Sequence, residues 1–301
     1  MPELPEVETT TRGLQSKIVG LTIVDVWTDL NTTDKRKNDA IATPKYFKVF
    51  RKEVLRKKVL SVERRAKNIL VNLSSGKTIL IHMKMTGHLL YGKYEYIKNI
   101  NKWTPLEKKG PLADPFNRFV HVVFTFSNKN QLAFSDARKF GKITLLDTKV
   151  AHDTKHLFGL GPEPLEKEFT LSKFIERLKK KPTGKIKTVL MDQSVVAGIG
   201  NIYSDEILWR AGVHPERKVL KITEPEFKLI FRAMKETLKK GIDFGGDSMS
   251  DYRNIDGLPG KFQTKHEVYR RKGLNCRKCG GTILRKVING RSAHFCPKHQ
   301  K

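Results

Sequence analysis

The spacing of hydrophobic positions changes about halfway along the chain. Residues 6–18 show a helical pattern, and short β-branched and aromatic runs follow, separated by Gly, Asn and Ser turns. The runs that we predict to be strands are 21–28, 59–63, 69–73, 78–83, 120–126 and 131–135, the last two joined by a turn at 127–130. The first half of the chain is therefore predicted to be a β-sandwich with one helix.

A Lys-rich stretch, residues 91–118, interrupts this strand pattern. It contains Trp103-Thr104-Pro105 and Asp114-Pro115-Phe116 and has no sustained period. A segment of this length without periodicity is typical of a surface loop. We predict a long loop here, and the sequence indicates no function for it.

The second half is predicted to be helical. Glycine and proline residues at 158–164 end the strand pattern. The best-marked helix begins at Thr223, with Glu226 completing a capping box, and ends at Gly241. A shorter helix follows Asn201, whose side chain is expected to cap it, and ends at Gly212. The predicted fold class is α+β, divided into an N-terminal domain (1–150), a linker (151–164), a helical domain (165–262) and a C-terminal ribbon (263–301).

The net charge of the chain indicates what kind of partner the protein binds. The 301 residues include 59 Lys and Arg against 31 Asp and Glu, a net charge of +28. Such an excess predicts a polyanionic partner, and nucleic acid is the leading candidate. A membrane-surface role is disfavoured because the basic residues are dispersed rather than gathered on one amphipathic helix. With an acidic start and no run of 18 apolar residues, we expect a cytoplasmic protein without a membrane span.

The three cysteines form the strongest local motif. Cys276 and Cys279 are separated by two residues, and the same spacing recurs 16 residues later in Cys296 and His299. Three thiolates and one imidazole at this spacing are typical of a structural zinc ribbon, so we predict one zinc ion. The intervening 282–288 and 292–295 are expected to form a hairpin with Asn289-Gly290 at its turn. The alternative, three buried thiols, does not explain the repeated spacing.

Two weaker signals concern binding and catalysis. Residues 196–201 form a glycine-rich turn that opens a helix, and exposed amides there, with Asn201, could hold a DNA phosphate; the alternative is an ordinary helix cap. At the start of the chain, removal of Met1 would leave Pro2 with a free α-amine, which is far more often neutral at pH 7 than a Lys amine. Glu3 beside it could move protons.

The chain closely resembles the formamidopyrimidine-DNA glycosylase family in separated segments that occur in the same order. These segments are Pro2-Glu3-Leu4-Pro5-Glu6-Val7-Glu8-Thr9, Arg64-Arg65-Ala66-Lys67, His82 to Gly87, Asp136 to Gly141, Leu160 to Pro164, Gly198 to Tyr203 and the zinc ribbon. The resemblance implies an N-terminal β-sandwich, a helical domain with a helix-two-turn-helix, and a zinc finger. It also implies excision of oxidised purines from double-stranded DNA, followed by strand cleavage at the abasic site.

The resemblance also implies roles for individual residues. Pro2 would be the nucleophile that forms an iminium with the sugar, Glu3 the acid, and Lys67 and Arg291 phosphate-binding residues that assist elimination. Met85, Arg138 and Phe140 match the residues that fill the gap left by a flipped base. Residues that would hold the DNA backbone are His82, Lys187, Asn201 and Tyr269; Glu6 and Glu206 would lie near the lesion, and 245–257 would cover it.

The sequence departs from the family pattern at a few positions. His299 stands where a fourth cysteine is common, Phe119 where a DNA-contacting histidine is common and Arg270 where glycine is usual; 91–118 is longer than expected. Two other functions stay open: an endonuclease VIII-like glycosylase for oxidised pyrimidines, and a non-catalytic DNA-binding zinc protein. Leu4 and the Met85, Arg138 and Phe140 set favour purines, and the presence of Pro2, Glu3 and Lys67 favours an enzyme. A monomer is expected.

Overall fold

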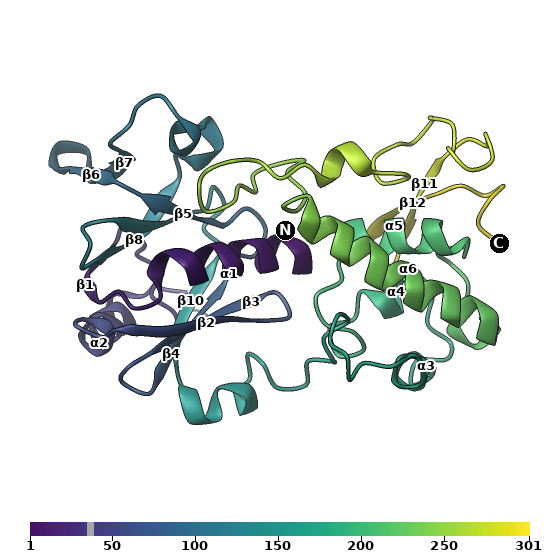
Figure 1. Cartoon of the computed structure of the whole chain (residues 1–301), viewed down its shortest axis with the longest axis horizontal. Coiled ribbons are helices and arrows are strands. Elements are labelled where there is room, and N and C mark those ends of the chain that lie inside the picture. The colour runs from purple at the N-terminus through teal and green to yellow at the C-terminus, as the bar shows by residue number, and fades with distance from the viewer. Residues whose placement is uncertain (35–38) are drawn as a thin grey trace. The chain divides into compact units, whose positions relative to one another are not determined.

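The computed structural model describes residues 1–34 and 39–301, which form two compact units (Figure 1). The first unit comprises Met1–Phe158 and Gly245–Lys261, and the second comprises Gly159–Phe244 and Phe262–Lys301. The change of unit after Phe158 falls within the predicted linker. The predicted helical domain, 165–262, contains a segment, 245–261, that the structure places in the first unit because Ile255 packs into that unit's core.

The first unit is a sandwich of two antiparallel four-stranded sheets, which confirms the predicted fold class. Both sheets contribute apolar side chains to one core, among them Phe124 and Ile79. One sheet has the order β1 (Ile23–Thr28), β8 (Val120–Phe126), β9 (Gln131–Ser135), β5 (His88–Gly92), and the other has β10 (Lys142–Asp147), β4 (Lys77–His82), β3 (Asn68–Leu73), β2 (Val59–Arg65). Helix α1 (Leu4–Ile18) packs on this core through Val7 and Leu14.

A second helix, α2 (Pro44–Val54), makes the prediction of a single helix in this unit wrong. It buries Phe50 and Val54, four residues apart on one face, and Tyr46 and Phe47 pack partly buried against the same core. Pro44 at its first turn is a start signal that the strand-dominated pattern hid. The apolar face of α2 joins the same core as α1.

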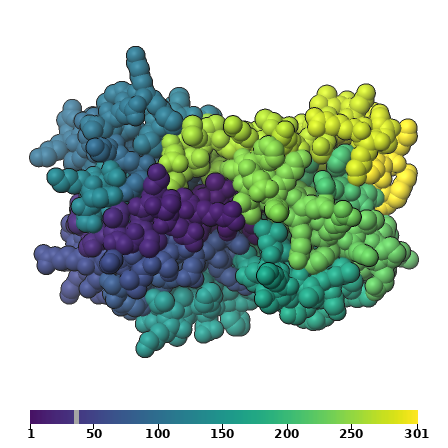
Figure 2. All heavy atoms as spheres, in the orientation of Figure 1, coloured from purple at the N-terminus to yellow at the C-terminus, as the bar shows by residue number. Residues whose placement is uncertain are grey.

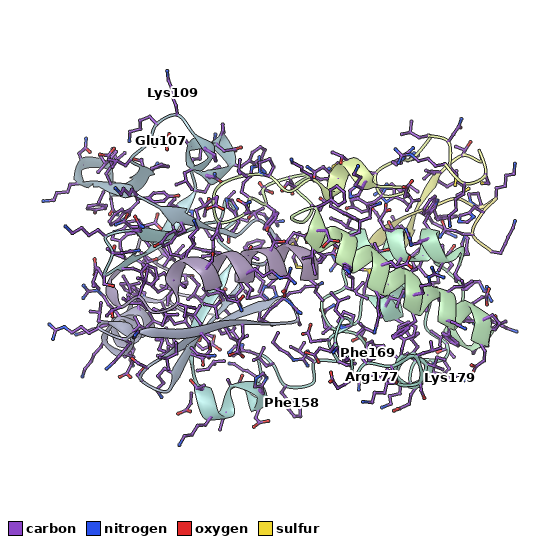
Figure 3. The ribbon with its side chains drawn as sticks, viewed as in Figure 1. Glu107, Lys109, Phe158, Phe169, Arg177 and Lys179 are labelled. Atoms are coloured by element: carbon purple, nitrogen blue, oxygen red, sulfur yellow. The ribbon has the colours of Figure 1, made fainter. Side chains whose placement is uncertain are left out.

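Residues 94–118, called here the hairpin segment, are more ordered than the predicted loop. They contain strands β6 (Tyr94–Ile97) and β7 (Lys102–Pro105), and the turns η2 (Lys98–Ile100), η3 (Pro111–Ala113) and η4 (Pro115–Asn117). Tyr96 and Trp103 pack on Trp27 of β1, with ring centroids 5.9 and 6.4 Å away. Glu107 and Lys109 lie at the outer tip of the segment (Figure 3). The prediction of an irregular loop was therefore wrong for 94–105.

The second unit is helical, with a terminal hairpin. Its elements are α3 (Leu171–Lys179), α4 (Ile186–Leu190), α5 (Asn201–Ala211), η6 (Val219–Lys221), α6 (Glu224–Asp243), η7 (Phe262–Lys265), β11 (Leu284–Ile288) and β12 (Arg291–Phe295); η5 (Thr148–Asp153) precedes them in the first unit. Within the described residues, no helix is both long and apolar enough to cross a membrane.

The predicted helix boundaries in this unit are partly correct. The Thr223 and Glu226 capping box is present at α6, but the helix runs through the buried Gly241 to Asp243. Asn201 is the first residue of α5 rather than its cap, because Gly200 adopts the extended capping conformation. Gly212 ends α5 with a φ of 75°, as predicted.

Candidate functional site

The start of α1 buries the two residues predicted to carry out chemistry. Pro2 and Glu3 are both buried, and Glu3 is the N-cap of the helix. The Glu3 side chain accepts a hydrogen bond from the Glu6 amide, and the Glu3 amide donates to Glu6 Oε2 at 2.7 Å. A reciprocal cap of this kind fixes the first helical turn. The carboxyl group of Glu3 is therefore held next to Pro2 and away from bulk solvent.

Glu6 has a second partner in the segment 245–261. Its Oε1 accepts a hydrogen bond from the Asp247 amide at 2.7 Å, and Gly246 lies so close that a Cβ there would be 2.8 Å from the Glu6 side chain. In Figure 2 this yellow-green segment borders the purple α1. Glu6 was predicted to lie near a lesion; the structure shows its carboxylate joining the start of α1 to the start of this segment.

Lys67 and His82 lie at the ends of neighbouring strands of one sheet. Lys67 is buried in the turn between β2 and β3, and His82 is the last residue of β4. Burial, together with the positive charges of Lys84 and Lys67, lowers the pKa of His82 to about 3. His82 Nδ1 accepts a hydrogen bond from the Lys84 amide at 3.0 Å, which places the imidazole proton on Nε2. His82 is thus a neutral hydrogen-bond donor at pH 7.

Met85, Arg138 and Phe140 are carried by two turns that Asp136 joins. The Asp136 carboxylate accepts hydrogen bonds from the Thr86 hydroxyl and from the amides of Arg138 and Gly141. Met85 is 38% exposed and Phe140 is 47% exposed, and the Arg138 guanidinium lies 4.5 Å above the Phe140 ring. The turns are fixed while three large side chains project into solvent. The sequence places Asp136 within a motif but does not indicate this role.

In the second unit, Lys187 lies in the interior and not on the surface, where a residue that contacts phosphate would lie. Its side chain is 1% exposed, and Nζ donates to Asp205 Oδ1 at 2.5 Å and to Ser204 Oγ at 3.1 Å. The other Asp205 oxygen accepts from the His294 amide at 2.9 Å. Lys187 therefore holds α4 and α5 together from the inside, and Asp205 is a partner that the sequence did not indicate.

Glu206 is also enclosed. It is 3% exposed and accepts three backbone hydrogen bonds, from the amides of Glu267, Val268 and Tyr269 at 2.8–3.0 Å. Burial raises the pKa of Glu206, against the opposing effect of these amides. The structure thus shows Glu206 holding the chain that carries Tyr269, whose half-buried ring packs between His266 and His294.

The glycine-rich turn before α5 is held by Gln193, another residue that the sequence did not single out. Its Oε1 accepts from the Gly198 amide at 2.9 Å, and its Nε2 donates to the Ile199 carbonyl at 2.8 Å. Asn201 follows as the half-buried first residue of α5. Because Gln193 already accepts the hydrogen bond of the Gly198 amide, the turn has fewer amides available to bind a phosphate than the sequence pattern implied.

The cysteines form a group that fits zinc. Among the described residues, the Sγ atoms of Cys276, Cys279 and Cys296 lie within 4.8 Å of one another. Trp209 Nε1 donates to Cys276 Sγ at 3.3 Å, a contact that would support a metal-bound thiolate. His299 is not among these gathered ligand atoms; its Nε2 lies 2.8 Å from the Trp209 carbonyl, and the neutral tautomer that donates this hydrogen bond has its lone pair on Nδ1.

Arg291 stands at the free end of the adjoining hairpin. It is exposed, begins β12 and pairs with Ile288 of β11. The predicted turn between them is confirmed, since Asn289 and Gly290 have φ values of 47° and 76°. The thiol group thus lies at one end of the ribbon and Arg291 at the other.

Comparison with known proteins assigns the family. Three family models match: the formamidopyrimidine-DNA glycosylase N-terminal domain at residues 1–143, its H2TH domain at 160–253, and a zinc finger found in FPG and IleRS at 273–298. These models cover both units and the ribbon. The predicted zinc finger is thereby confirmed as a domain of this chain.

Full-length relatives agree with the family models. The formamidopyrimidine-DNA glycosylases of Pelotomaculum thermopropionicum and Heliobacterium modesticaldum are each 38% identical to this chain over 301 residues. Each match covers 100% of this chain; it covers 99% of the Pelotomaculum protein and 100% of the Heliobacterium protein. A complex of Lactococcus lactis Fpg with abasic-site DNA matches with a TM-score of 0.83 at 32% identity over 99% of both chains. A complex of MutM with DNA containing carbocyclic 8-oxo-G matches with a TM-score of 0.82 at 32% identity over 100% of both. The chain belongs to the formamidopyrimidine-DNA glycosylase family and is a DNA-binding repair enzyme that acts on damaged bases.

Proposed function

We propose that this enzyme removes oxidised purines, namely 8-oxoguanine and formamidopyrimidines, from double-stranded DNA and then cleaves the strand at the abasic site. The observation that carries the proposal is the buried Glu3 carboxyl group, held by the α1 cap beside Pro2. A proton donor next to a secondary amine is the arrangement that iminium chemistry on a sugar requires. The similar MutM complex, whose DNA contains carbocyclic 8-oxo-G, favours the purine substrate.

The proposed reaction begins at the Pro2 nitrogen. This nitrogen forms a bond to C1′ as the glycosidic bond breaks; the base leaves with the electron pair of that bond and takes up the proton that the Pro2 nitrogen gives up. Glu3 protonates the ring oxygen, the sugar opens, and an iminium links Pro2 to C1′. The iminium acidifies C2′, so that loss of its proton expels the 3′ phosphate. A second elimination expels the 5′ phosphate, and hydrolysis of the iminium releases Pro2.

This reaction requires a free Pro2 nitrogen. While Met1 is attached, that nitrogen is part of an amide and cannot attack C1′. We therefore propose that Met1 is removed in the active enzyme. An intact-mass spectrum of active protein should show the chain without Met1; an active chain that retains it would contradict the Pro2 mechanism.

The remaining predicted residues receive proposed roles that their surroundings support. Lys67 and the neutral His82 bind phosphates of the damaged strand. The gap that a flipped base leaves is filled by Met85, Arg138 and Phe140, since they project from fixed turns.

The second unit binds the DNA backbone through Asn201, Tyr269 and Arg291. Lys187 and Glu206 contribute indirectly, because Lys187 holds α4 and α5 together and Glu206 holds the chain that carries Tyr269. Glu6 acts near the lesion by anchoring the segment 245–261, whose residues 245–257 cover the displaced base. The enzyme works on cytoplasmic DNA as a monomer.

We propose one structural zinc ion per chain, bound by Cys276, Cys279, Cys296 and Nδ1 of His299. The hydrogen bond from His299 Nε2 to a carbonyl is the outer contact that a histidine ligand commonly makes. When bound, the ion would cross-link the ribbon and supply no reacting group. Arg291 depends on this ribbon for its position.

Metal analysis tests this site. The purified protein is expected to contain one zinc, which Cys296→Ala removes and Arg291→Ala retains. Cys296→Ala should weaken binding to abasic DNA at least about tenfold, because the ribbon loses its cross-link. His299→Ala should bind zinc more weakly, and His299→Cys should restore full zinc content. A wild-type protein free of zinc after expression with added zinc would contradict the proposal.

The overall proposal is tested by borohydride trapping on a duplex with one 8-oxoguanine opposite cytosine. Borohydride reduces the iminium to a stable covalent complex, which is expected for the wild type. A complex with abasic DNA but none with 8-oxoguanine would overturn the purine substrate. Tight binding without a complex on either duplex would indicate a DNA-binding protein that has lost the chemistry.

A further inference from the structure

The segment 245–261 has an exposed tip between two anchored ends. At one end, the Asp247 amide donates to Glu6, and at the other, the Gly260 amide donates to Ser248 Oγ at 2.8 Å, closing the base of a loop. Tyr91 donates its amide to the carbonyl of the buried Ile255 at 2.7 Å. Between these anchors, residues 249–250 are exposed. Next to this exposed tip, the Tyr252 hydroxyl donates to the Glu6 carbonyl at 3.0 Å, which fixes the side of the loop that faces α1.

Arg253 links the tip to the hairpin segment of the first unit. It is 6% exposed, and its Nη1 donates to the carbonyls of Ser250 and Tyr252 at 3.0 and 2.9 Å. Its Nε donates to Asp114 Oδ2 at 3.2 Å, and the guanidinium lies 4.4 Å above the Phe116 ring. One side chain thus joins the exposed tip to the hairpin segment.

The part of the hairpin segment that receives Arg253 is itself fixed. Asp114 caps η4 by accepting the Phe116 amide at 2.8 Å, so its carboxylate has a defined direction. Asn117 donates to the Pro111 carbonyl at 2.9 Å and contacts His88 Nε2 at 2.9 Å, which ties η4 to β5. Gly257 lies so close to Pro111 that a Cβ would meet its carbonyl carbon at 2.6 Å.

We propose that Asp114, Phe116 and Arg253 form a tether through which the hairpin segment positions the loop 245–261 for base excision. The inference rests on the proposed function, in which this loop covers the displaced base. When the glycosidic bond breaks, the damaged base must be held in place, so the position of the loop over the base affects the rate of this step. This position does not matter for cleavage at an abasic site, where no base is present. The three residues are positioning residues, and the hairpin segment gains a role that its sequence did not reveal.

Asp114→Asn is the variant that tests the tether. An Asn oxygen can still cap η4, while the charged pair with Arg253 is lost, leaving a buried guanidinium short of a partner. Single-turnover excision of 8-oxoguanine should fall about tenfold, a loss of about 1.4 kcal/mol in transition-state stabilisation. Cleavage of an abasic duplex should stay within about twofold. Asp25→Asn, which breaks the half-exposed pair with Arg51, should change neither rate.

A double variant separates the tether from a general effect. Arg253→Met should show the same selective loss, and adding Asp114→Asn to it should cost little more, since the two residues act as a pair. Equal falls in excision and in abasic-site cleavage would overturn the proposal and indicate a merely structural role. Unchanged excision in both single variants would also overturn it.

Amide hydrogen exchange of the DNA-free protein tests the tether without any activity. Asp114→Asn should speed exchange at residues 247–260 at least about fivefold and leave β8 and β9 unchanged. Unchanged exchange at 247–260 would overturn the tether whatever the activities show. If the wild type fails to excise 8-oxoguanine, the proposed function fails, and the exchange result still decides whether the tether exists.

Discussion

Replacing Glu3 with Gln is expected to lower the rate of 8-oxoguanine excision about a thousandfold. A positioned general acid contributes about 10² to 10⁴ in rate, and an amide cannot donate a proton to the opening sugar in the same way. The fold should be retained, because a Gln oxygen can still accept the Glu6 amide that the Glu3 carboxylate accepts. Single-turnover kinetics on the 8-oxoguanine duplex measure the loss, and thermal melting checks the fold.

A matched carboxyl group on the same helix provides the control. Glu8 accepts from Arg12 and from Arg64, each at 2.7 Å, and has no part in the proposed reaction. Glu8→Gln should excise 8-oxoguanine within about twofold of the wild-type rate. A Glu3→Gln enzyme that also retains wild-type excision would show that the proton comes from elsewhere.

The nucleophile is tested by Pro2→Gly. Glycine leaves a primary amine in place of the secondary amine, and its freer backbone loosens the position of that nitrogen. Borohydride trapping should fall steeply, while binding to the same duplex persists. Together, the variants at Pro2 and Glu3 separate loss of the nucleophile from loss of the acid.

Local patterns in the sequence predicted local structure well. The Asn289-Gly290 turn, the Thr223 capping box and the spacing of the cysteines each depend on residues close together in the chain, and each is confirmed. The α+β class and the β-sandwich followed from the same strand and helix periods. Where neighbours along the sequence determine the geometry, the pattern contains the required information.

Contacts between distant residues explain what the sequence could not predict. The resemblance implied a DNA-backbone contact for Lys187 and did not indicate its buried partner, because Asp205 lies 18 residues away on another helix. The residues 245–261 follow a long helix and yet pack with the first unit, because Ile255 and Asp247 find partners there. Arg253 and Asp114 are separated by 139 residues. Only the folded chain shows which charges are buried and paired.

The buried pair of Lys187 and Asp205 predicts the largest effect on stability. Replacing Lys187 with Met is expected to lower the free energy of unfolding by about 3–5 kcal/mol, because it leaves the Asp205 carboxylate buried without its cation. Both side chains are 1% exposed or less, so solvent cannot compensate. Since Asp205 also accepts from the His294 amide, the loss should reach β12 as well as α5. Denaturant unfolding measures the change.

Two further variants show whether the unpaired charge is the cause. Lys187→Met with Asp205→Asn should recover part of the lost stability, because a neutral amide oxygen can still accept the His294 amide without leaving a buried charge. Lys181→Met, which removes the more exposed partner of Asp192, should cost no more than about 1 kcal/mol. If Lys187→Met instead unfolds like the wild type but binds abasic DNA far more weakly, Lys187 contacts phosphate directly, and its interior pairing is not its role in the DNA complex.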